Sequence, residues 1–480
     1  MRLTTLFRDS RALAALAVPL VLTQLAQVAL TTTDTVMMGM LGAAELAAGG
    51  LAIVIFNQLR TMGVGLVTSV GNQVAAAAAR AENHAADPGG RPVQEDTQAV
   101  EDTVEGEVGA IVRASLAVAT VAGVTGAVLM LLIGRLLPYL GQEGAVAERA
   151  QHMLLALAPG LLPCLWFQAI RQFTVGMRRP QALLRITLVS VAVNAGLNWA
   201  FIHGTWGIPK LGLPGVGVAT SLVYLLSFLA LYLSIRRDPI LAPLISLNIT
   251  TADRETVRRL TRLGIPIAAT YGSEAGFFSV TTLMAGSFGS AALAAHAAVN
   301  QLVYIVFQVA VGLSHAASIN VSRELAHDRP AAALRIKNTA LACAAAVMSL
   351  VAVLYIAVPE LVLAPFLDAG AARNGEAISI ASHLLLVTMV LQFFDCAQNI
   401  GVGLLRGLDD TKSGFRITLI GYWAVGLPAA ALLAYAAELE TLGIWLGLLT
   451  GLGATAILLL RRYSAALRPR LTAPESVPAT

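Results

Sequence analysis

Long apolar stretches separated by short polar segments make up most of the chain. A helix needs about 20 mostly apolar residues to cross the hydrocarbon core of a bilayer. By that measure the pattern predicts an all-α polytopic membrane protein with twelve transmembrane helices. The predicted spans are residues 12–38, 45–79, 110–137, 151–177, 183–203, 215–235, 260–286, 291–322, 336–365, 376–405, 414–436 and 441–460.

The amino-terminal part of this pattern recurs later in the chain. A shift of 247 positions superimposes two predicted helices and their connection without a gap. Because chance matches among Ala, Gly and Leu are common in so apolar a chain, the prolines and the ungapped spacing carry most of this inference. The matched positions are Pro19 with Pro266, Met37 with Met284, Gly39 with Gly286, Gly42 with Gly289, Leu46-Ala47-Ala48 with Leu293-Ala294-Ala295, and Val74 with Val321.

A second set of repeated residues lies further along the chain. It pairs Phe167 with Phe394, Val175-Gly176 with Val402-Gly403 and, after an insertion of four residues, Arg185-Ile186-Thr187-Leu188 with Arg416-Ile417-Thr418-Leu419. We therefore expect two homologous lobes of six spans each, an N-lobe at residues 1–240 and a C-lobe at 241–480. Repeats of like orientation imply a pseudo-twofold axis along the membrane normal and a central cavity between the lobes.

The basic residues indicate how the chain is oriented. With the N-terminus inside, all but six of the 32 Lys and Arg residues fall in inside segments, which places both termini in the cytoplasm. The first apolar run has no clear small-residue cleavage site, so we interpret it as a membrane span, with a cleaved signal peptide as the alternative. Residues 82–107 form an acidic segment, which we expect to be a mobile cytoplasmic loop with no mechanistic role.

Composition narrows the class of function. Hydrophobic residues make up 57% of the chain and charged residues 12%, which is too apolar for a water-soluble surface of this size. The net charge of +4 comes with no basic stripe, so no nucleic-acid partner is expected. The three cysteines have no paired spacing, and no nucleophile elbow, HExxH motif or phosphate-binding loop is present. We therefore expect no enzyme activity and no cofactor, and transport would depend on an ion gradient.

Three carboxylates lie within predicted spans: Asp34, Glu274 and Asp395. A charge at bilayer depth costs at least ~2.5 kcal/mol, so each acid requires a partner, water or a function, with packing alone as the competing interpretation. Glu274 and Asp395 together could hold Na⁺ through oxygen ligands or take up a proton, and the sequence leaves both options open. In the repeat alignment only one member of each pair ionises: Asp34 aligns with Thr281, Glu274 with Gln27, and Asp395 with Gln168.

Other polar residues within spans are candidates for a cavity. Asn194 and Asn198 are one turn apart and share a helix face, where they either line an N-lobe cavity or, as spacing alone favours, join neighbouring helices. Arg60 is near the middle of its span and must face protein or water, either as the partner of a carboxylate in the mechanism or as a structural counter-ion. Arg171 is nearer the inner end of its span and is expected to snorkel or to meet helix-end carbonyls.

Aromatic residues give a weaker signal. Phe277 and Phe394 could form the floor of an apolar drug pocket, although aromatic side chains at helical spacing mostly serve packing. Gln168 marks, through the alignment, the N-lobe location that corresponds to Asp395, and we include it among the candidate cavity residues.

Several stretches, in their order and spacing, resemble the multidrug and toxic compound extrusion (MATE) family, in its NorM-like branch. The resemblance covers nearly the whole chain. The stretches that carry it are Asp34-x2-Met37-x-Gly39-x2-Gly42-x3-Leu46-Ala47-Ala48; Phe167-Gln168-x2-Arg171-x-Phe173-x2-Gly176; Asn194-x3-Asn198; Gly212-x2-Gly215-x-Gly217-x-Ala219-Thr220; Leu263-Gly264-x-Pro266; and Asp395-x2-Gln398 with Arg406-Gly407-x2-Asp410-Thr411 and Tyr422-Trp423.

The resemblance implies an antiporter of the bacterial inner membrane that is expected to act as a monomer. Such a protein exports amphiphilic, cationic drugs and dyes through alternating access, in exchange for inward Na⁺ or protons. The resemblance assigns cation coupling to Glu274 and Asp395, a further cation or substrate role to Asp34, and the lining of the N-lobe cavity to Asn194 and Asn198.

Two features depart from the family pattern. Arg60 stands where the family usually has an uncharged residue, and a positive charge there would weaken the attraction for cationic substrates or neutralise one acid. The acidic insertion after Arg80 is also longer than the family pattern. Within transport, the alternative is a flippase for lipid-linked precursors of the same superfamily, which would need a larger and more basic cavity.

Overall fold

The computed structural model describes residues 3–86, 96–140, 144–205, 207, 209–367 and 375–472, and over these ranges the regular structure is helical. The long helices are α1 (Leu3–Leu41), α2 (Ala43–Thr68), α3 (Val70–Ala86), α4 (Asp96–Leu136), α5 (Gly144–Gly176), α6 (Gln181–His203), α7 (Leu213–Arg236), α8 (Arg254–Gly286), α9 (Ser290–Ala326), α10 (Pro330–Ala357), α12 (Gly375–Gly407) and α15 (Glu440–Thr472).

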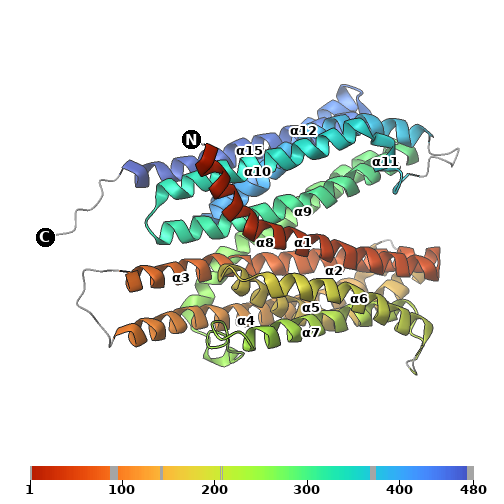
Figure 1. Cartoon of the computed structure of the whole chain (residues 1–480). Coiled ribbons are helices and arrows are strands. Elements are labelled where there is room, and N and C mark those ends of the chain that lie inside the picture. Colours follow the sequence, from red (N-terminus) through yellow and green to blue (C-terminus); the bar gives the residue numbers. More distant parts are fainter. Residues whose placement is uncertain are drawn as a thin grey trace. The chain divides into compact units, whose positions relative to one another are not determined.

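Shorter helical segments complete the described chain (Figure 1). The short α-helices are α11 (Pro359–Leu363), α13 (Thr411–Leu419) and α14 (Leu427–Ala431). The π-helical turns η3 (Ile420–Gly426) and η4 (Leu432–Ala436) alternate with α13 and α14, and the 3₁₀ turns are η1 (Leu137–Leu140) and η2 (Ile249–Thr251).

The all-α prediction is confirmed, and eleven of the described helical segments are long and apolar enough to cross a membrane. The remaining predicted span, 260–286, lies in the 33-residue helix α8, which is less apolar because Thr270-Tyr271-Gly272-Ser273-Glu274 interrupts it. The predicted span 336–365 is not one continuous helix. It breaks at Val358, because the following Pro359 disfavours helical geometry in the residue before it.

The acidic segment 82–107 is not a loop over its whole length. Helix α3 continues to Ala86 and α4 already begins at Asp96, while residues 87–95 lie outside the described part of the chain. An ion pair between Arg80 of α3 and Glu107 of α4 joins the two helices near this segment. Both helices therefore extend beyond their apolar parts into the polar segment, and its polar composition did not prevent helix formation.

The helices pack into two compact units, one formed by Leu22–Gly272 and the other by Met1–Val21 with Ser273–Thr480. The boundaries of these units fall inside α1 and α8, and the division into lobes at residues 1–240 and 241–480 stays a prediction. The segment that follows α7 is packed and does not form a free linker. Its side chains Leu241, Leu244 and Ile245 are buried, and the carbonyl oxygen of Leu244 lies beside Gly109 of α4.

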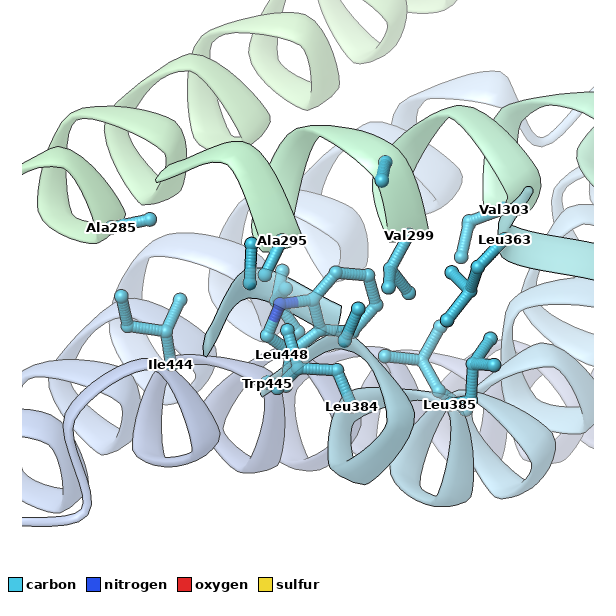
Figure 2. Close-up of a cluster of buried hydrophobic side chains, with 14 of the residues drawn as sticks. Ala285, Ala295, Val299, Val303, Leu363, Leu384, Leu385, Ile444, Trp445 and Leu448 are labelled. Carbon is cyan, nitrogen blue, oxygen red and sulfur yellow. The ribbon is translucent and has the colours of Figure 1, made fainter. Parts of the chain in front are cut away.

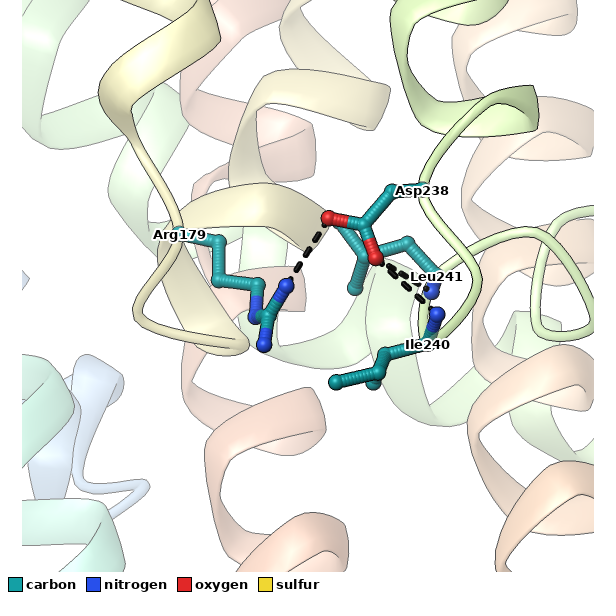
Figure 3. Close-up of polar contacts among 4 residues, drawn as sticks. All are labelled: Arg179, Asp238, Ile240 and Leu241. Atoms are coloured by element: carbon teal, nitrogen blue, oxygen red, sulfur yellow. Dashed lines mark hydrogen bonds and ion pairs between the residues drawn. The ribbon is translucent and has the colours of Figure 1, made fainter.

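In the Leu22–Gly272 unit, α5 is the central helix and packs against α2, α4 and α7. The buried core of this unit includes Met38 of α1, Phe56 of α2 and Leu161 of α5. A polar contact joins the turn after α5 to the segment after α7 (Figure 3). Arg179, in the turn between α5 and α6, donates from Nη1 to Oδ2 of Asp238 at 2.9 Å, while Oδ1 of Asp238 accepts the backbone N–H groups of Ile240 and Leu241.

In the unit that contains Ser273–Thr480, α12 is central and packs against α9, α10 and α15. Figure 2 shows Trp445 of α15 surrounded by apolar side chains of α9 and α12. Trp445 is 1% exposed, and its indole Nε1 donates to Nδ1 of His296 at 3.2 Å. The polar atom of this large side chain is therefore satisfied inside an apolar core.

The first internal repeat is visible in the backbone. Gly42 and Gly289, 247 positions apart, precede α2 and α9 with φ angles of 124° and 106°. Each accepts a hydrogen bond from the residue four positions later, Leu46 at 2.9 Å and Leu293 at 3.1 Å. Glycine tolerates this positive φ without a steric penalty, so the same residue is found at the same turn in both repeats.

The second repeat has a different register from the predicted one. A Cβ on Gly176 would lie 2.6 Å from the carbonyl oxygen of Gly71, and a Cβ on Gly407 would lie 2.9 Å from that of Ser318. Gly71 and Ser318 are 247 positions apart, so Gly176 corresponds to Gly407 and not to Gly403. The pairing then needs no four-residue insertion, because the shift from Gly176 to Gly407 equals that from Arg185 to Arg416. For the register of the repeat, two glycines at the same close contact between helices are a more reliable guide than isolated identical residues.

Candidate functional site

Asp34 is the centre of a buried polar cluster in the Leu22–Gly272 unit. It lies near the end of α1 and is 4% exposed. Its Oδ1 accepts hydrogen bonds from Nδ2 of Asn194 at 2.6 Å and from Nδ2 of Asn198 at 2.7 Å, and its Oδ2 accepts one from Oγ1 of Thr220 at 3.0 Å. Three helices, α1, α6 and α7, therefore converge on one carboxylate.

The two asparagines use their amide nitrogens but not their side-chain oxygens in this cluster. Asn194 and Asn198 are fully buried, and the side-chain Oδ1 atom of each has no hydrogen-bond partner. An unsatisfied buried carbonyl oxygen is costly, so two of them beside a carboxylate indicate a place for a cation or for a proton donor. The interhelical role favoured by spacing is correct, but the asparagines hold an acid and do not simply join apolar helices.

A second polar cluster lies in the unit that contains Ser273–Thr480. Glu274 of α8 accepts a hydrogen bond from the hydroxyl of Tyr422 at 3.2 Å, and the charges of Glu274 and Asp395 interact. Asp395 is 4% exposed, and Nδ2 of Asn399, one turn further along α12, lies 3.3 Å from its Oδ1. The structure thus brings together the two acids that the sequence analysis paired, and it adds Tyr422 and Asn399.

Phe277 does not form the floor of a cavity. It is fully buried and stacks on Tyr422 with ring centroids 4.9 Å apart and an interplanar angle of 10°. Phe394 packs against the same apolar core and faces Gly453. Phe277 thus holds the tyrosine that reaches Glu274, and a drug-binding role of the partly buried Phe394 stays a prediction.

Gln168, a predicted cavity residue, is buried and contacts Arg171. Its Oε1 accepts a hydrogen bond from Nη1 of Arg171 at 3.1 Å, and Nη2 of Arg171 donates to Oε1 of Gln24 at 2.9 Å. Arg171 is 4% exposed, so it neither snorkels to the interface nor relies on helix-end carbonyls. The corrected repeat register also removes the correspondence of Gln168 with Asp395, and places Cys164 opposite Asp395 instead.

Two small neighbouring cavities, each large enough only for water-sized molecules, lie inside the Leu22–Gly272 unit. They share Leu30, Thr31 and Tyr224 in their linings. Arg60 lines the larger cavity and Asp34 the smaller one. Asn194 and Asn198 lie fully buried against the carboxylate of Asp34, behind the wall of the smaller cavity, and their predicted role in lining a cavity stays a prediction.

Thr220, Tyr422 and Asn399 were not identified as site residues from the sequence. Thr220 and Asn399 are ordinary polar residues in apolar helices, and their contacts join positions that are distant in the sequence or lie one turn apart. Tyr422 stands in the π-helical turn η3, which the hydrophobic pattern does not distinguish from an α-helix. Two local signals pointed to the cluster at Asp34: the acid itself within an apolar span, and the regular spacing of Asn194 and Asn198.

Comparisons with known proteins agree with this architecture. The MatE family model matches residues 105–200 and 266–432. A probable multidrug resistance protein NorM of Pseudomonas aeruginosa is 36% identical over 472 residues, covering 98% of this chain and 92% of the relative. A protein of the same name from Mesorhizobium japonicum is 32% identical over 462 residues, covering 95% and 94%.

Solved structures share the fold. A MATE protein crystallised in complex with MaL6 superimposes with a TM-score of 0.83 at 17% identity, covering 97% of this chain and 98% of that one. The eukaryotic MATE transporter AtDTX14 superimposes with a TM-score of 0.80 at 20% identity, covering 97% and 100%. With the matching family model and relatives above 30% identity over nearly the whole length, this chain belongs to the MATE family, in its NorM-like branch.

Proposed function

We propose that this protein is a multidrug efflux antiporter of the bacterial inner membrane, with both termini in the cytoplasm. It exports amphiphilic compounds in exchange for an inward-moving Na⁺ ion or proton. The names of its relatives, multidrug resistance proteins, support the substrate class. The buried acids support the coupling, because a membrane protein retains costly intramembrane carboxylates chiefly for ion or substrate pathways.

The cluster at Asp34 is the observation that carries the coupling proposal. Its carboxylate, the hydroxyl of Thr220 and the two unsatisfied Oδ1 atoms of Asn194 and Asn198 gather oxygen atoms in one buried place. Oxygen ligands of this kind suit a hard cation such as Na⁺. A proton on the carboxylate is the alternative occupant, because burial disfavours the charged form of an acid.

The pair Glu274 and Asp395 supplies a second place for a cation. Two interacting carboxylates lose their mutual repulsion when a cation or a proton enters between them. A bound ion drives transport only through its different affinity for two conformations. In this mechanism the cation binds these acids, favours one conformation and thereby promotes substrate release on the outer side.

Dye transport in proteoliposomes tests this function. Ethidium movement is followed with an imposed Na⁺ gradient in one set and a proton gradient in the other, for the wild type and for Asp34→Asn and Asp395→Asn. We expect one gradient to drive dye movement and at least one of the two variants to lose it. Absence of movement under both gradients, with correctly folded and oriented protein, contradicts the proposal and makes a lipid-precursor flippase the next function to test.

Glu45→Gln is the matched control for these variants. Glu45 is an acid of the same unit, but it pairs with Arg149 at 3.0 Å and both side chains are partly exposed. Its neutralisation changes the net charge as Asp34→Asn does, without touching the buried cluster. We expect Glu45→Gln to transport dye like the wild type.

A further inference from the structure

Three exposed arginines form a stripe along the first turns of α8. Arg254, Arg258 and Arg262 are four positions apart, so they share one face of the helix over about 12 Å of its length. Among the described residues, none of the three forms an ion pair. Ile265 continues the same face and is 55% exposed. The arginine stripe is therefore a row of unpaired positive charge that ends beside an exposed apolar side chain.

The acids near the arginine stripe are engaged elsewhere. Asp253 caps α8, because its Oδ2 accepts the backbone N–H of the residue three positions later at 2.8 Å. Glu255 lies one turn before Arg259, the order in which an acid and a base attract each other on a helix. Asp238 accepts a hydrogen bond from the side chain in the turn after α5 (Figure 3). The protein itself thus supplies little negative charge to the stripe.

The segment between α7 and α8 adds exposed apolar side chains at the same end of the Leu22–Gly272 unit. It begins after Arg236, where the spanning helix α7 ends, and it leads directly into the arginine stripe. Ile240 is 52% exposed and Leu247 is 41% exposed, although the other side of this segment is packed. Exposed apolar side chains with basic residues on both sides are typical of a segment that lies in the headgroup layer of a membrane.

We propose that the arginine stripe binds the headgroup phosphate of an anionic phospholipid. A guanidinium donates two parallel hydrogen bonds to phosphate oxygens, and basic residues beside a membrane span attract anionic lipids. Ile265 favours a lipid over free phosphate, because only the lipid places an apolar chain beside its headgroup. The same helix carries Glu274, so the bound lipid contacts the element that bears part of the second polar cluster.

Lipid titration with native mass spectrometry of the purified full-length protein measures this binding. Phosphatidylglycerol is compared with phosphatidylcholine of the same acyl chains. The stripe variants are Arg258→Gln and the triple variant Arg254→Gln/Arg258→Gln/Arg262→Gln. Arg259→Gln is the matched control, because Arg259 is also exposed but lies about 100° further around the helix than Arg258.

We expect the wild type to bind phosphatidylglycerol more tightly than phosphatidylcholine. Arg258→Gln should weaken phosphatidylglycerol binding by about fivefold, and the triple variant by about a hundredfold, since each basic residue near the membrane surface contributes a similar amount. Arg259→Gln should change it by less than about twofold, and the affinity for phosphatidylcholine should stay the same in all variants. Added salt should weaken the preference for the anionic lipid.

Three results would overturn the proposal. Equal affinity of the wild type for the two lipids excludes an anionic lipid site. Equal losses in Arg258→Gln and Arg259→Gln show diffuse attraction to the basic end of the helix and not a site at the stripe. Displacement of phosphatidylglycerol by excess inorganic phosphate at constant ionic strength shows that the stripe recognises phosphate alone, whereas undisturbed binding supports the lipid.

Folding and transport are kept separate from this test. The substituted side chains are exposed, so the melting temperatures of the variants should match that of the wild type. If the triple variant does not fold, the comparison of Arg258→Gln with Arg259→Gln decides the outcome. Lipid binding is measured without any dye or gradient, so its result is independent of the antiporter proposal.

Discussion

Asn194 donates a hydrogen bond of 2.6 Å to Oδ1 of Asp34 across 160 positions of sequence. The contact is buried, and the acceptor oxygen of the same asparagine has no partner. One amide thus holds the carboxylate in place while its own oxygen stays available. This arrangement suits a site that is alternately filled and emptied, because the carboxylate remains oriented in both states.

Asp34→Asn should weaken cation binding at this cluster. The substitution conserves volume but removes the charge and places an amide against two amide donors. We expect the cation affinity to fall by about tenfold or more, the scale of a lost hydrogen-bonded charge. Cation-dependent change in tryptophan fluorescence of the purified protein measures it. Affinity equal to that of Glu45→Gln would show that the cation does not use Asp34.

Tyr422→Phe should alter coupling without unfolding the protein. The ring still stacks on Phe277, but the hydroxyl that donates to Glu274 is lost. A hydrogen bond to a charged group contributes about 1.5–3 kcal/mol, so the concentration of cation for half-maximal transport should shift by about tenfold.

Tyr435→Phe is the matched control for that substitution. The hydroxyl of Tyr435 lies 2.8 Å from Oγ of Ser287, and the ring is 50% exposed. We expect its half-maximal cation concentration to equal that of the wild type. The role given to Tyr422 is wrong if the two variants behave alike.

Gly176→Ala and Gly407→Ala should each destabilise the protein by a similar amount. Both new Cβ atoms would lie under 3.0 Å from backbone or Cβ atoms of a neighbouring helix, where neither side can move cheaply. Overpacking of this kind costs about 1–3 kcal/mol. Thermal melting in detergent measures the loss, and a change at one glycine only would contradict the corrected repeat register.

Gly196→Ala is the control for these two glycines. It lies inside α6 with nothing within 4 Å of the added Cβ. Replacing a helical glycine by alanine in open space stabilises a helix by about 0.5–1 kcal/mol. The melting temperature should therefore rise slightly, in the direction opposite to Gly176→Ala.

Asp410 should make the stability of the protein depend on pH in the acidic range. Burial favours its neutral form, but hydrogen bonds from Ser413 and Arg462 outweigh burial and hold the pKa of Asp410 below its ordinary value. A carboxyl with a lowered folded pKa adds stability above its unfolded pKa of about 4, and that stability is lost as the pH falls through the folded pKa. Asp410→Asn should remove this part of the pH dependence between about pH 5 and 2.

Asp410→Ala separates the charge from the helix cap. The Oδ1 of Asp410 accepts the backbone N–H of Ser413 at the start of α13, and loss of such an N-cap costs about 1 kcal/mol. Melting temperatures measured against pH should place Asp410→Ala below Asp410→Asn, since asparagine also caps helices well. Identical pH profiles for the wild type and Asp410→Asn would contradict the lowered pKa.

The hydrophobic pattern was sufficient for the helices and for the duplication. Apolar length predicts a span because a bilayer requires it, and Gly42 and Gly289 mark the repeat because each backbone turn needs a positive φ. The pattern failed where backbone chemistry acts locally, as at the break before Pro359. The span predicted at 260–286 is a helix, α8, although the polar residues of the candidate site lower its apolarity.

The sequence by itself determined the membrane class, the repeat and three intramembrane acids, because these follow from local composition and spacing. Tertiary structure decided which residues meet each acid. Only packing brings Asn194, Asn198 and Thr220 to Asp34 and places Tyr422 on Glu274. Contacts between distant helices depend on rotation and register, and a one-residue change of register turns a side chain by about 100° around its helix. Periodicity along one helix does not contain that information.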